Sequence, residues 1–404
     1  MKLSQKIKND AVDYMVGGIG YVIDTFEKRA PGSKGEKDAQ DYFNSELAKT
    51  CDSVKTEEFT LSPDAFMDWI YITASLMIAG FISYFFLPVL AIALLLIAFI
   101  PLISQLVMYK TLIDPLFKKK TSVNVVGVIK PTGTVKRRII INGHADATQE
   151  WHWHYKFGMK GLLVVVAASL VGAFYIIGLS IAALITNGAE PAVASGVLLI
   201  LGLCGLVFVV FWVALYKFHD KKVIVDGAND NLTACYVSLA VPKAFKEGGI
   251  KLKNTELCVL ISGSEEAGLR GAKAFAKAHK EEYSDVETIV VCMETLREAE
   301  HFSLYTKDIN GTVKTDLDVA GLVREAGKSN GVDLKYATVS LGATDSGAFA
   351  QAGFKSTCLA AMAHNLQDYY HTRRDTKDNL DPAVIGKAFD IVTDAIFLYD
   401  EKGL

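Results

Sequence analysis

The stretch 256–280 reads ELCVLISGSEEAGLRGAKAFAKAHK and predicts a strand, an acidic turn and a helix in direct succession. The apolar run that ends at Ser262 is typical of a buried strand, and the run that follows Gly268 is typical of a helix. A strand joined at once to a helix is the unit from which α/β folds are built. The turn between the two also places Glu265 and Glu266 directly after the strand.

The same alternation continues on both sides of this stretch. Strand-like runs lie at 122–130, 137–146, 286–295 and 355–362, and helix-like runs lie at 231–248, 268–282, 316–331 and after Pro382. Strands that alternate with helices predict an α/β sandwich, in which helices flank a mixed, mostly parallel central sheet.

Two apolar stretches interrupt this pattern. No Asp, Glu, Lys or Arg lies between Asp68 and Lys110, and only Glu190 lies between Gly161 and Tyr216. Each stretch has room for two membrane spans of ~20 residues. The turns would lie near Pro88 and in the segment TNGAEP at 186–191. Buried helices of a soluble protein are the alternative, but they rarely exceed about 15 wholly apolar residues. We therefore expect transmembrane hairpins at 67–109 and 160–217.

The charges that flank the hairpins predict their orientation. The far turns carry almost no charge, whereas nine lysines lie at the near ends: Lys110, Lys118, Lys119, Lys120, Lys156, Lys160, Lys217, Lys221 and Lys222. The positive-inside rule places the near side in the cytoplasm. The polar segments 1–66, 110–158 and 218–404 return to this side each time, so they should form a single discontinuous domain.

Composition narrows the classes of partner and the cellular compartment that the sequence allows. The 404 residues carry a formal net charge of only -3, which argues against a nucleic-acid partner. The six cysteines show no CxxC spacing and favour free thiols in a reducing compartment. The N-terminal residues include lysines but no apolar segment of a cleavable signal peptide.

Acids and histidines follow almost every predicted strand. In a parallel α/β sheet, ligands gather at the carboxyl ends of the strands. The side chains at these positions are His144, Asp146, Asp226, Asp230, Glu265, Glu266, Glu294 and His371. Nitrogen and carboxylate donors brought to one edge in this way favour a hydrolytic site with two zinc ions.

Seven segments resemble the di-zinc aminopeptidases of the aminopeptidase S and aminopeptidase Y type, whose relatives include glutamate carboxypeptidase and glutaminyl cyclase. They lie in the family's order and cover nearly all of the polar chain: RAPGSKGEKDAQDYF (29–43), NVVGVIK (124–130), GHAD (143–146), GANDNLTA (227–234), SGSEEAGLRGA (262–272), GATDSGAFAQAGF (342–354) and YYHTRRDTKDNLD (369–381).

The resemblance implies a metal ligand for each of five positions. His144 and Glu294 would hold one zinc, and Glu266 and His371 would hold the other. Asp230 would bridge the two ions, and the peptide bond after it would be cis. The family usually has an aspartate where this chain has Glu294, so that zinc position stands in some doubt.

Two further acids would take part in the reaction. Glu265 would be the general base for the bridging water, and Asp146 would orient His144. The implied function is a membrane-embedded exopeptidase, most simply an aminopeptidase acting on peptides that include hydrophobic, membrane-associated ones. A glutaminyl cyclase or carboxypeptidase activity and a catalytically inactive membrane scaffold remain as alternatives, and a transporter is a weaker one.

The segment EWHWHYKFGMK (150–160) joins the predicted site to the third span. Its tryptophans would lie at headgroup depth with Lys156 and Lys160 facing anionic lipid. We read His152 and His154 as part of this interface, and His219, His279, His301 and His364 as packing or surface residues. Since His144 precedes Trp151 by few residues, we expect the catalytic edge to lie near the bilayer, with an opening toward the bilayer as a hypothesis.

Overall fold

The computed structural model of the protein describes residues 3–188, 193, 196–363 and 367–404. The chain divides into two compact units. The first comprises Met1–Pro63, Lys119–Gln149 and Val223–Leu404, and the second comprises Asp64–Lys118 and Glu150–Lys222. Each unit is therefore built from segments that are distant in the sequence.

A nine-stranded sheet forms the centre of the first unit. Its strands follow one another in space as β1 (Ser53–Leu61), β2 (Lys120–Ile129), β6 (Thr255–Ser262), β3 (Arg137–His144), β7 (Glu287–Leu296), β11 (Lys355–Ala361), β8 (Phe302–Asp308) and β10 (Lys335–Thr338), and β9 (Val313–Lys314) pairs with β8.

The middle of this sheet is parallel and its outer parts are mixed. Strands β6, β3, β7 and β11 all pair in parallel, whereas β2 pairs antiparallel with β6 and β8 pairs antiparallel with β11. The sheet is thus mixed, and the parallel character that the sequence predicts belongs to its four central strands. Strands β1, β8, β9 and β10 are not among the predicted runs.

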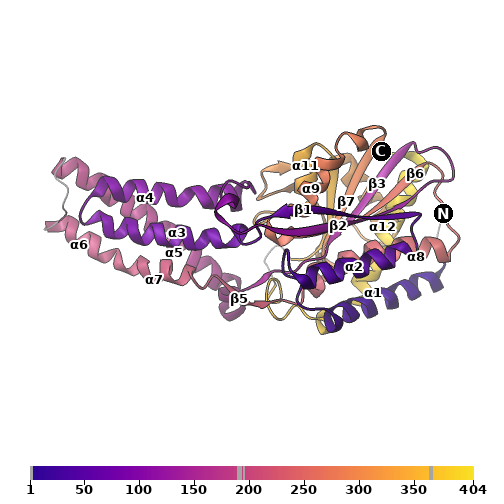
Figure 1. Ribbon diagram of the computed structural model, residues 1–404, viewed down its shortest axis with the longest axis horizontal. Coiled ribbons are helices and arrows are strands. Elements are labelled where there is room, and N and C mark those ends of the chain that lie inside the picture. The colour runs from indigo at the N-terminus through magenta and orange to yellow at the C-terminus, as the bar shows by residue number, and fades with distance from the viewer. Residues whose placement is uncertain (1–2, 189–192, 194–195, 364–366) are drawn as a thin grey trace. The chain divides into compact units, whose positions relative to one another are not determined.

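Helices cover both faces of the sheet (Figure 1). The larger core lies on the face covered by α1 (Gln5–Thr25), α2 (Lys34–Ala48), α8 (Thr233–Glu247), α10 (Leu317–Ser329) and α12 (Pro382–Lys402). Ile139 and Ile141 of β3 point into this core, as alternate residues of a strand do. The shorter helices α9 (Arg270–His279) and α11 (Asp345–Ala352) pack together and against the sheet.

Polar side chains fix the starts of several of these helices. Asp381 accepts hydrogen bonds from the backbone N–H groups of Ala383 and Val384, and Pro382 occupies the first position of α12. Ser33 caps α2 in the same way, since its hydroxyl accepts from the backbone N–H of Glu36 at 3.2 Å. The hydrogen bond to Ser33 also fixes the backbone position of Glu36.

The second unit consists mainly of apolar helices. Four helices among the described residues are long and apolar enough to cross a membrane: Ala65–Tyr84, Pro88–Val107, His152–Asn187 and Gly196–Leu215. In Figure 1 they correspond to α3 (Ala65–Tyr84), α4 (Pro88–Pro101) with the π-helical turn after it, α5 (His152–Asn187), and α6 (Gly196–Cys204) with α7 (Leu206–Leu215). A short two-stranded sheet pairs β4 (Gln149–Trp151) with β5 (His219–Ile224).

The two apolar stretches that interrupt the sequence thus form helices. The predicted break at Pro88 separates α3 from α4, with Pro88 at the start of the second helix. Residues 189–191 of the predicted turn, which include Glu190, lie outside the described residues.

Candidate metal centre

The carboxyl ends of the parallel strands bring the predicted ligands together. His144 is the last residue of β3, Glu294 lies near the end of β7, and Glu265 and Glu266 form the 3₁₀ turn Glu265–Ala267 after β6. Asp230 lies in the short segment Ala228–Leu232 that leads into α8. All five of these residues are at most 9% exposed.

Asp230 lies between the two histidines. One of its carboxylate oxygens lies 3.2 Å from His144 Nε2 and the other lies 3.1 Å from His371 Nε2. Each oxygen therefore faces a different imidazole, which is the arrangement that a bridging ligand requires. The peptide bond between Asp230 and Asn231 is cis, as the resemblance implies.

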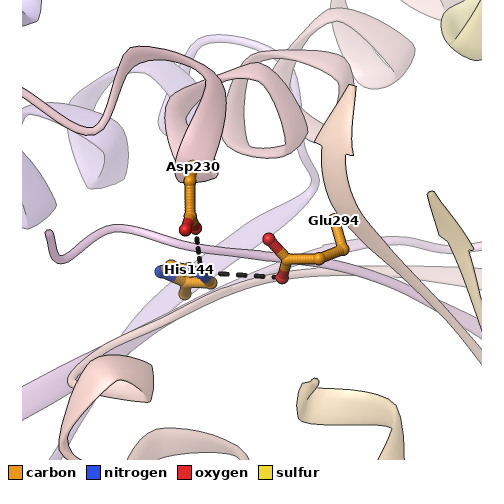
Figure 2. Close-up of side chains that lie close together, drawn as sticks. All are labelled: His144, Asp230 and Glu294. Atoms are coloured by element: carbon orange, nitrogen blue, oxygen red, sulfur yellow. Dashed lines mark ion pairs between the residues drawn. The ribbon is translucent and has the colours of Figure 1, made fainter. Parts of the chain in front are cut away.

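Two groups of potential metal ligands share this aspartate. One ligand atom from each of His144, Asp230 and Glu294 lies within 4.8 Å of the others, and the same holds for Asp230, Glu266 and His371. Figure 2 shows the first group, in which Glu294 Oε2 lies 3.7 Å from His144 Nε2. In the second group, Glu266 Oε1 lies 3.3 Å from His371 Nε2.

Neighbouring groups hold Glu294 in place. The side-chain amide of Asn231 donates to Glu294 Oε2 at 3.1 Å, and the Thr295 hydroxyl donates to Oε1 at 2.9 Å. These two hydrogen bonds therefore hold the carboxylate of Glu294 beside His144.

Asp146 supports both the acidic turn and His144. Its two oxygens accept hydrogen bonds from the backbone N–H groups of Glu265 and Glu266, each at 2.9 Å. Asp146 Oδ1 also lies 3.4 Å from His144 Nδ1, and its side chain is fully buried. Glu265 Oε2 lies 3.8 Å from His144 Nε2, so the turn places this carboxylate beside both ligand groups.

His371 is positioned by an unusual backbone. Its φ of 53° is left-handed, a conformation that is uncommon outside glycine and found often at functional sites. The ring of Tyr370 stacks on the imidazole with 3.9 Å between ring centres. The loop therefore turns the imidazole toward Asp230 and Glu266.

The ionisable groups of the site perturb one another strongly. Burial raises the pKa of Glu265 well above its usual range, and although His144 opposes this, the charge of Glu266 adds to it. Burial and the charge of Asp230 raise the pKa of Glu294 to about 8. Burial alone would also raise the pKa of Asp230, but hydrogen bonds from His144 and His371 hold it well below its usual range.

This donor set fits zinc. Two imidazole nitrogens and three carboxylates offer the nitrogen and oxygen ligands of catalytic zinc sites. Four mutually repelling buried acids, Asp230, Glu265, Glu266 and Glu294, are costly to keep together without a cation. Bound cations would let the carboxylates ionise and would keep both imidazoles neutral.

Three supporting residues were not identified from the sequence as part of the site. Glu36 accepts hydrogen bonds from the backbone N–H and the hydroxyl of Ser264, at 2.6 and 2.9 Å, and so holds the turn that carries Glu265. Asp375 accepts from the backbone N–H groups of Asn229 and Asp230. Both acids lie in segments that resemble the family, so the resemblance was the signal in the sequence that could have identified them.

Arg29 is the third supporting residue. Its guanidinium donates to the backbone oxygens of Ala145, at 2.7 Å, and of Asp226 and Gly227. Gly227 has a φ of 59°, and a Cβ there would lie 2.6 Å from the Asp230 carbonyl oxygen. Arg29 therefore links the end of β3 to the tight turn before Asp230.

The other candidates lie outside the two ligand groups. Asp226 forms an ion pair with Lys28. His152 and His154 lie in α5, in the second unit. Among the remaining histidines, His219 contacts Asp68, His279 contacts Glu57 and Glu282, and His301 lies in a surface turn, whereas His364 lies outside the described residues.

A pocket borders the first ligand group. Glu294 and Tyr370 line it together with Tyr305 and Met362, and the segment 338–341 closes another side. The pocket is thus part polar, next to the ligands, and part apolar.

Comparisons with known proteins agree with this geometry. Residues 214–396 match the model of peptidase family M28. The match begins within the last residues of the second apolar stretch and includes Asp230, Glu265, Glu266, Glu294 and His371, but not His144 or Asp146. No curated protein sequence matches the chain.

Solved structures show the same fold at low sequence identity. A zinc aminopeptidase from Bacillus subtilis is 14% identical with a TM-score of 0.57, over 96% of this chain and 94% of that one. The aminopeptidase from Aneurinibacillus sp. strain AM-1 is 14% identical with a TM-score of 0.58, over 97% and 95%. The glutaminyl cyclase of Bacteroides thetaiotaomicron is 13% identical with a TM-score of 0.56, over 98% and 99%.

The family match, the shared fold and the ordered motifs agree. Residues 214–396 are therefore similar to peptidase family M28, in agreement with the family that the motifs resemble.

Proposed function

We propose that the protein is a two-zinc aminopeptidase held in a membrane by four helical spans. The observation that carries the proposal is the sharing of Asp230 by two buried ligand groups, with one carboxylate oxygen facing each histidine. His144 and Glu294 would hold one ion, Glu266 and His371 would hold the other, and Asp230 would be shared by both. This division is the one that the sequence resemblance implies.

Glu265 is the general base of the proposed reaction. When bound, the two zinc ions lower the pKa of a water molecule and polarise the scissile carbonyl group. Glu265 accepts the proton of that water and passes it to the leaving amine. Its backbone N–H is fixed by Asp146, which also orients His144, so one buried aspartate aligns the base with a ligand.

The pocket beside Glu294 suggests how the substrate is placed. Its apolar part, lined by Val339, Leu341 and Met362, suits the side chain of the first substrate residue. The acidic ligand groups that this pocket borders through Glu294 suit the free α-amine of that residue. A peptide with a blocked amino terminus would lose this interaction with the acids.

The test is a product profile from peptides with free and with blocked amino termini. The wild-type protein should release the first residue from free peptides only. Glu265→Gln should retain its zinc and lose at least about 10²-fold in kcat, the contribution typical of a positioned acid–base group. Glu247→Gln, an exposed substitution on α8, is the matched control and should keep wild-type activity.

Other products would favour the alternatives. Release of the carboxyl-terminal residue would indicate a carboxypeptidase, and conversion of amino-terminal glutamine without cleavage would indicate a cyclase. No turnover of any peptide would favour an inactive scaffold. Unchanged hydrolysis by the Glu265→Gln variant would refute the role of this residue as the base.

The membrane location rests on the four apolar helices and on the lysines that flank them. The catalytic domain lies in the cytoplasm in this proposal. The protein should remain in the membrane pellet after alkaline carbonate extraction, and protease added from the cytoplasmic side should cleave the catalytic domain. Extraction into the supernatant would refute membrane integration, and cleavage only from the other side would refute the orientation. The distance of the site from the bilayer stays a prediction.

A further inference from the structure

A groove of about 410 Å³ lies between α5 and α7 in the second unit. Trp153, Phe157 and Val164 form the α5 side, and Val210, Phe211 and Ala214 form the α7 side. Phe157, Val164 and Val210 are 65%, 57% and 67% exposed, so the groove opens away from the helix core. Its volume falls within the range of sites that bind small molecules.

The lysine-rich end of this groove is held rigid by one hydrogen bond. The indole N–H of Trp153 donates to the backbone oxygen of Ala214 at 2.9 Å and so links the two helices. The ring of Phe157 stacks on that of Trp153 at 6.1 Å with an interplanar angle of 14°. Because the only polar atom of the indole is already bonded, Trp153 presents an apolar wall to the groove.

One cation lines this otherwise apolar groove. Lys160 lies on α5 between Phe157 and Val164, and the rest of the lining is apolar. Lys156 lies four residues earlier on α5, before the kink at Gly158, and Lys217 follows the end of α7, so the positive charge gathers at one end of the two helices. A long apolar slot with a positive charge at its polar end complements a chain that carries a negative headgroup.

We propose that this groove binds an anionic phospholipid, with one acyl chain between α5 and α7 and the headgroup phosphate on Lys160. The proposal rests on the membrane location proposed above. Lysines at the level of the headgroups attract anionic lipid, and their methylene stems extend along apolar surface. Phosphatidylglycerol should therefore be retained in preference to phosphatidylcholine.

The experiment measures the lipid that stays bound to the full-length protein. Protein reconstituted with equal amounts of phosphatidylglycerol and phosphatidylcholine is released from the bilayer and analysed by native mass spectrometry. Wild type should carry phosphatidylglycerol in preference to phosphatidylcholine by about fivefold or more, the effect of a single lysine on an anionic lipid. Lys160→Gln should remove the preference, and Val164→Trp should fill the groove and abolish retention of both lipids.

Two matched variants serve as controls. Lys222→Gln removes an exposed lysine outside the groove, and Val171→Trp enlarges an exposed residue of α5 outside the groove. Both should behave as wild type. A Lys160→Gln variant that keeps the preference, or a Val164→Trp variant that retains as much lipid as Val171→Trp, would overturn the proposal.

Carbonate extraction of the same preparations separates this proposal from the membrane location. Protein that resists extraction but shows no preference for phosphatidylglycerol refutes the lipid site alone. Protein that is extracted refutes the membrane location and the lipid site together.

Discussion

Glu36 is a buried carboxylate on which the acidic turn depends. It accepts four hydrogen bonds, from the backbone N–H of Gly32, the hydroxyl of Ser122, and both the N–H and the hydroxyl of Ser264. In Glu36→Gln, the new amide N–H₂ would face donors, and one or more of them would lose its acceptor. We expect a loss of about 1–3 kcal/mol in unfolding free energy and a fall in kcat, because Glu265 follows Ser264.

Thermal unfolding and peptide hydrolysis check this prediction. Asp41→Asn on the same helix is the control, since that side chain is 56% exposed and paired only with Lys37. Equal stability and activity in the two variants would show that the turn does not depend on Glu36.

His279 gives a stability effect that depends on pH. Its Nε2 lies 2.8 Å from Glu57 and its Nδ1 lies 2.6 Å from Glu282, and the bond to Glu57 raises the pKa of the imidazole. A histidine whose pKa is raised by folding stabilises fully below its unfolded pKa of about 6.5, and this effect disappears as pH rises through the folded pKa. Burial alone would raise the pKa of Glu57, but His279 lowers it, so that contribution is lost only in acid.

The melting temperature of His279→Gln should therefore fall furthest below wild type near pH 6, where histidine is charged and glutamate is ionised. The difference should shrink as pH increases. A difference that stays constant from about pH 6 to pH 10 would show that the charge of His279 does not stabilise the fold.

The sequence reveals the ligands but not their supports. His144, Glu266 and Glu294 lie at or just after the carboxyl ends of parallel strands, which meet at one edge of the sheet, so position and residue type mark them as candidates. The family resemblance was needed to assign all five ligands, including Asp230 and His371. Glu36 and Asp375 act through hydrogen bonds to distant backbone groups. Such contacts depend on the three-dimensional path of the loops, which no local pattern encodes.

At the scale of elements, the contact of β3 with α8 determines where His144 lies. A Cβ on Gly143 would lie 2.7 Å from the backbone of Ala234 and Cys235, which cannot move aside as a flexible side chain could. Gly143→Ala should force α8 away from the strand and destabilise the protein by about 1–3 kcal/mol. Because His144 is the next residue, zinc affinity should fall as well.

Gly321→Ala on α10 is the matched glycine control. A Cβ there meets nothing within 4 Å, so replacement in this helix should be neutral or stabilising by about 0.5–1 kcal/mol. Thermal unfolding and zinc titration compare the two variants. A Gly143→Ala protein as stable and as zinc-avid as Gly321→Ala would contradict the close packing of β3 and α8.

Strands could be predicted from the sequence where a single hydrophobic pattern dominated. The central strands β3, β6 and β7 are buried along most of their length and read as continuous apolar runs, which predicted them. Strand β1 mixes exposed and partly buried residues and carries two glutamates, and β10 is mostly exposed. Their pairing with neighbours decides their structure, so composition alone did not identify them.

At the scale of the whole molecule, one α/β fold is assembled from three segments of chain. The family match starts at residue 214, so the sequence comparison does not cover His144 or Asp146. The sheet nevertheless places β3 between β6 and β7, which brings His144 and Asp146 next to the other residues of the site. Apolar helices are readily predicted because their length and composition are distinctive, and two spans in each stretch predicted that the polar segments form one domain. The order of the strands within its sheet follows only from the fold.

The number of zinc ions bound per chain tests the central claim most directly. Metal analysis of the purified full-length protein should give about two zinc ions per chain. His144→Ala should leave about one, and Asp230→Asn, which changes the shared ligand, should weaken both sites. A wild-type protein that binds at most one zinc, or an Asp230→Asn variant that retains two with unchanged affinity, would contradict a centre bridged by Asp230.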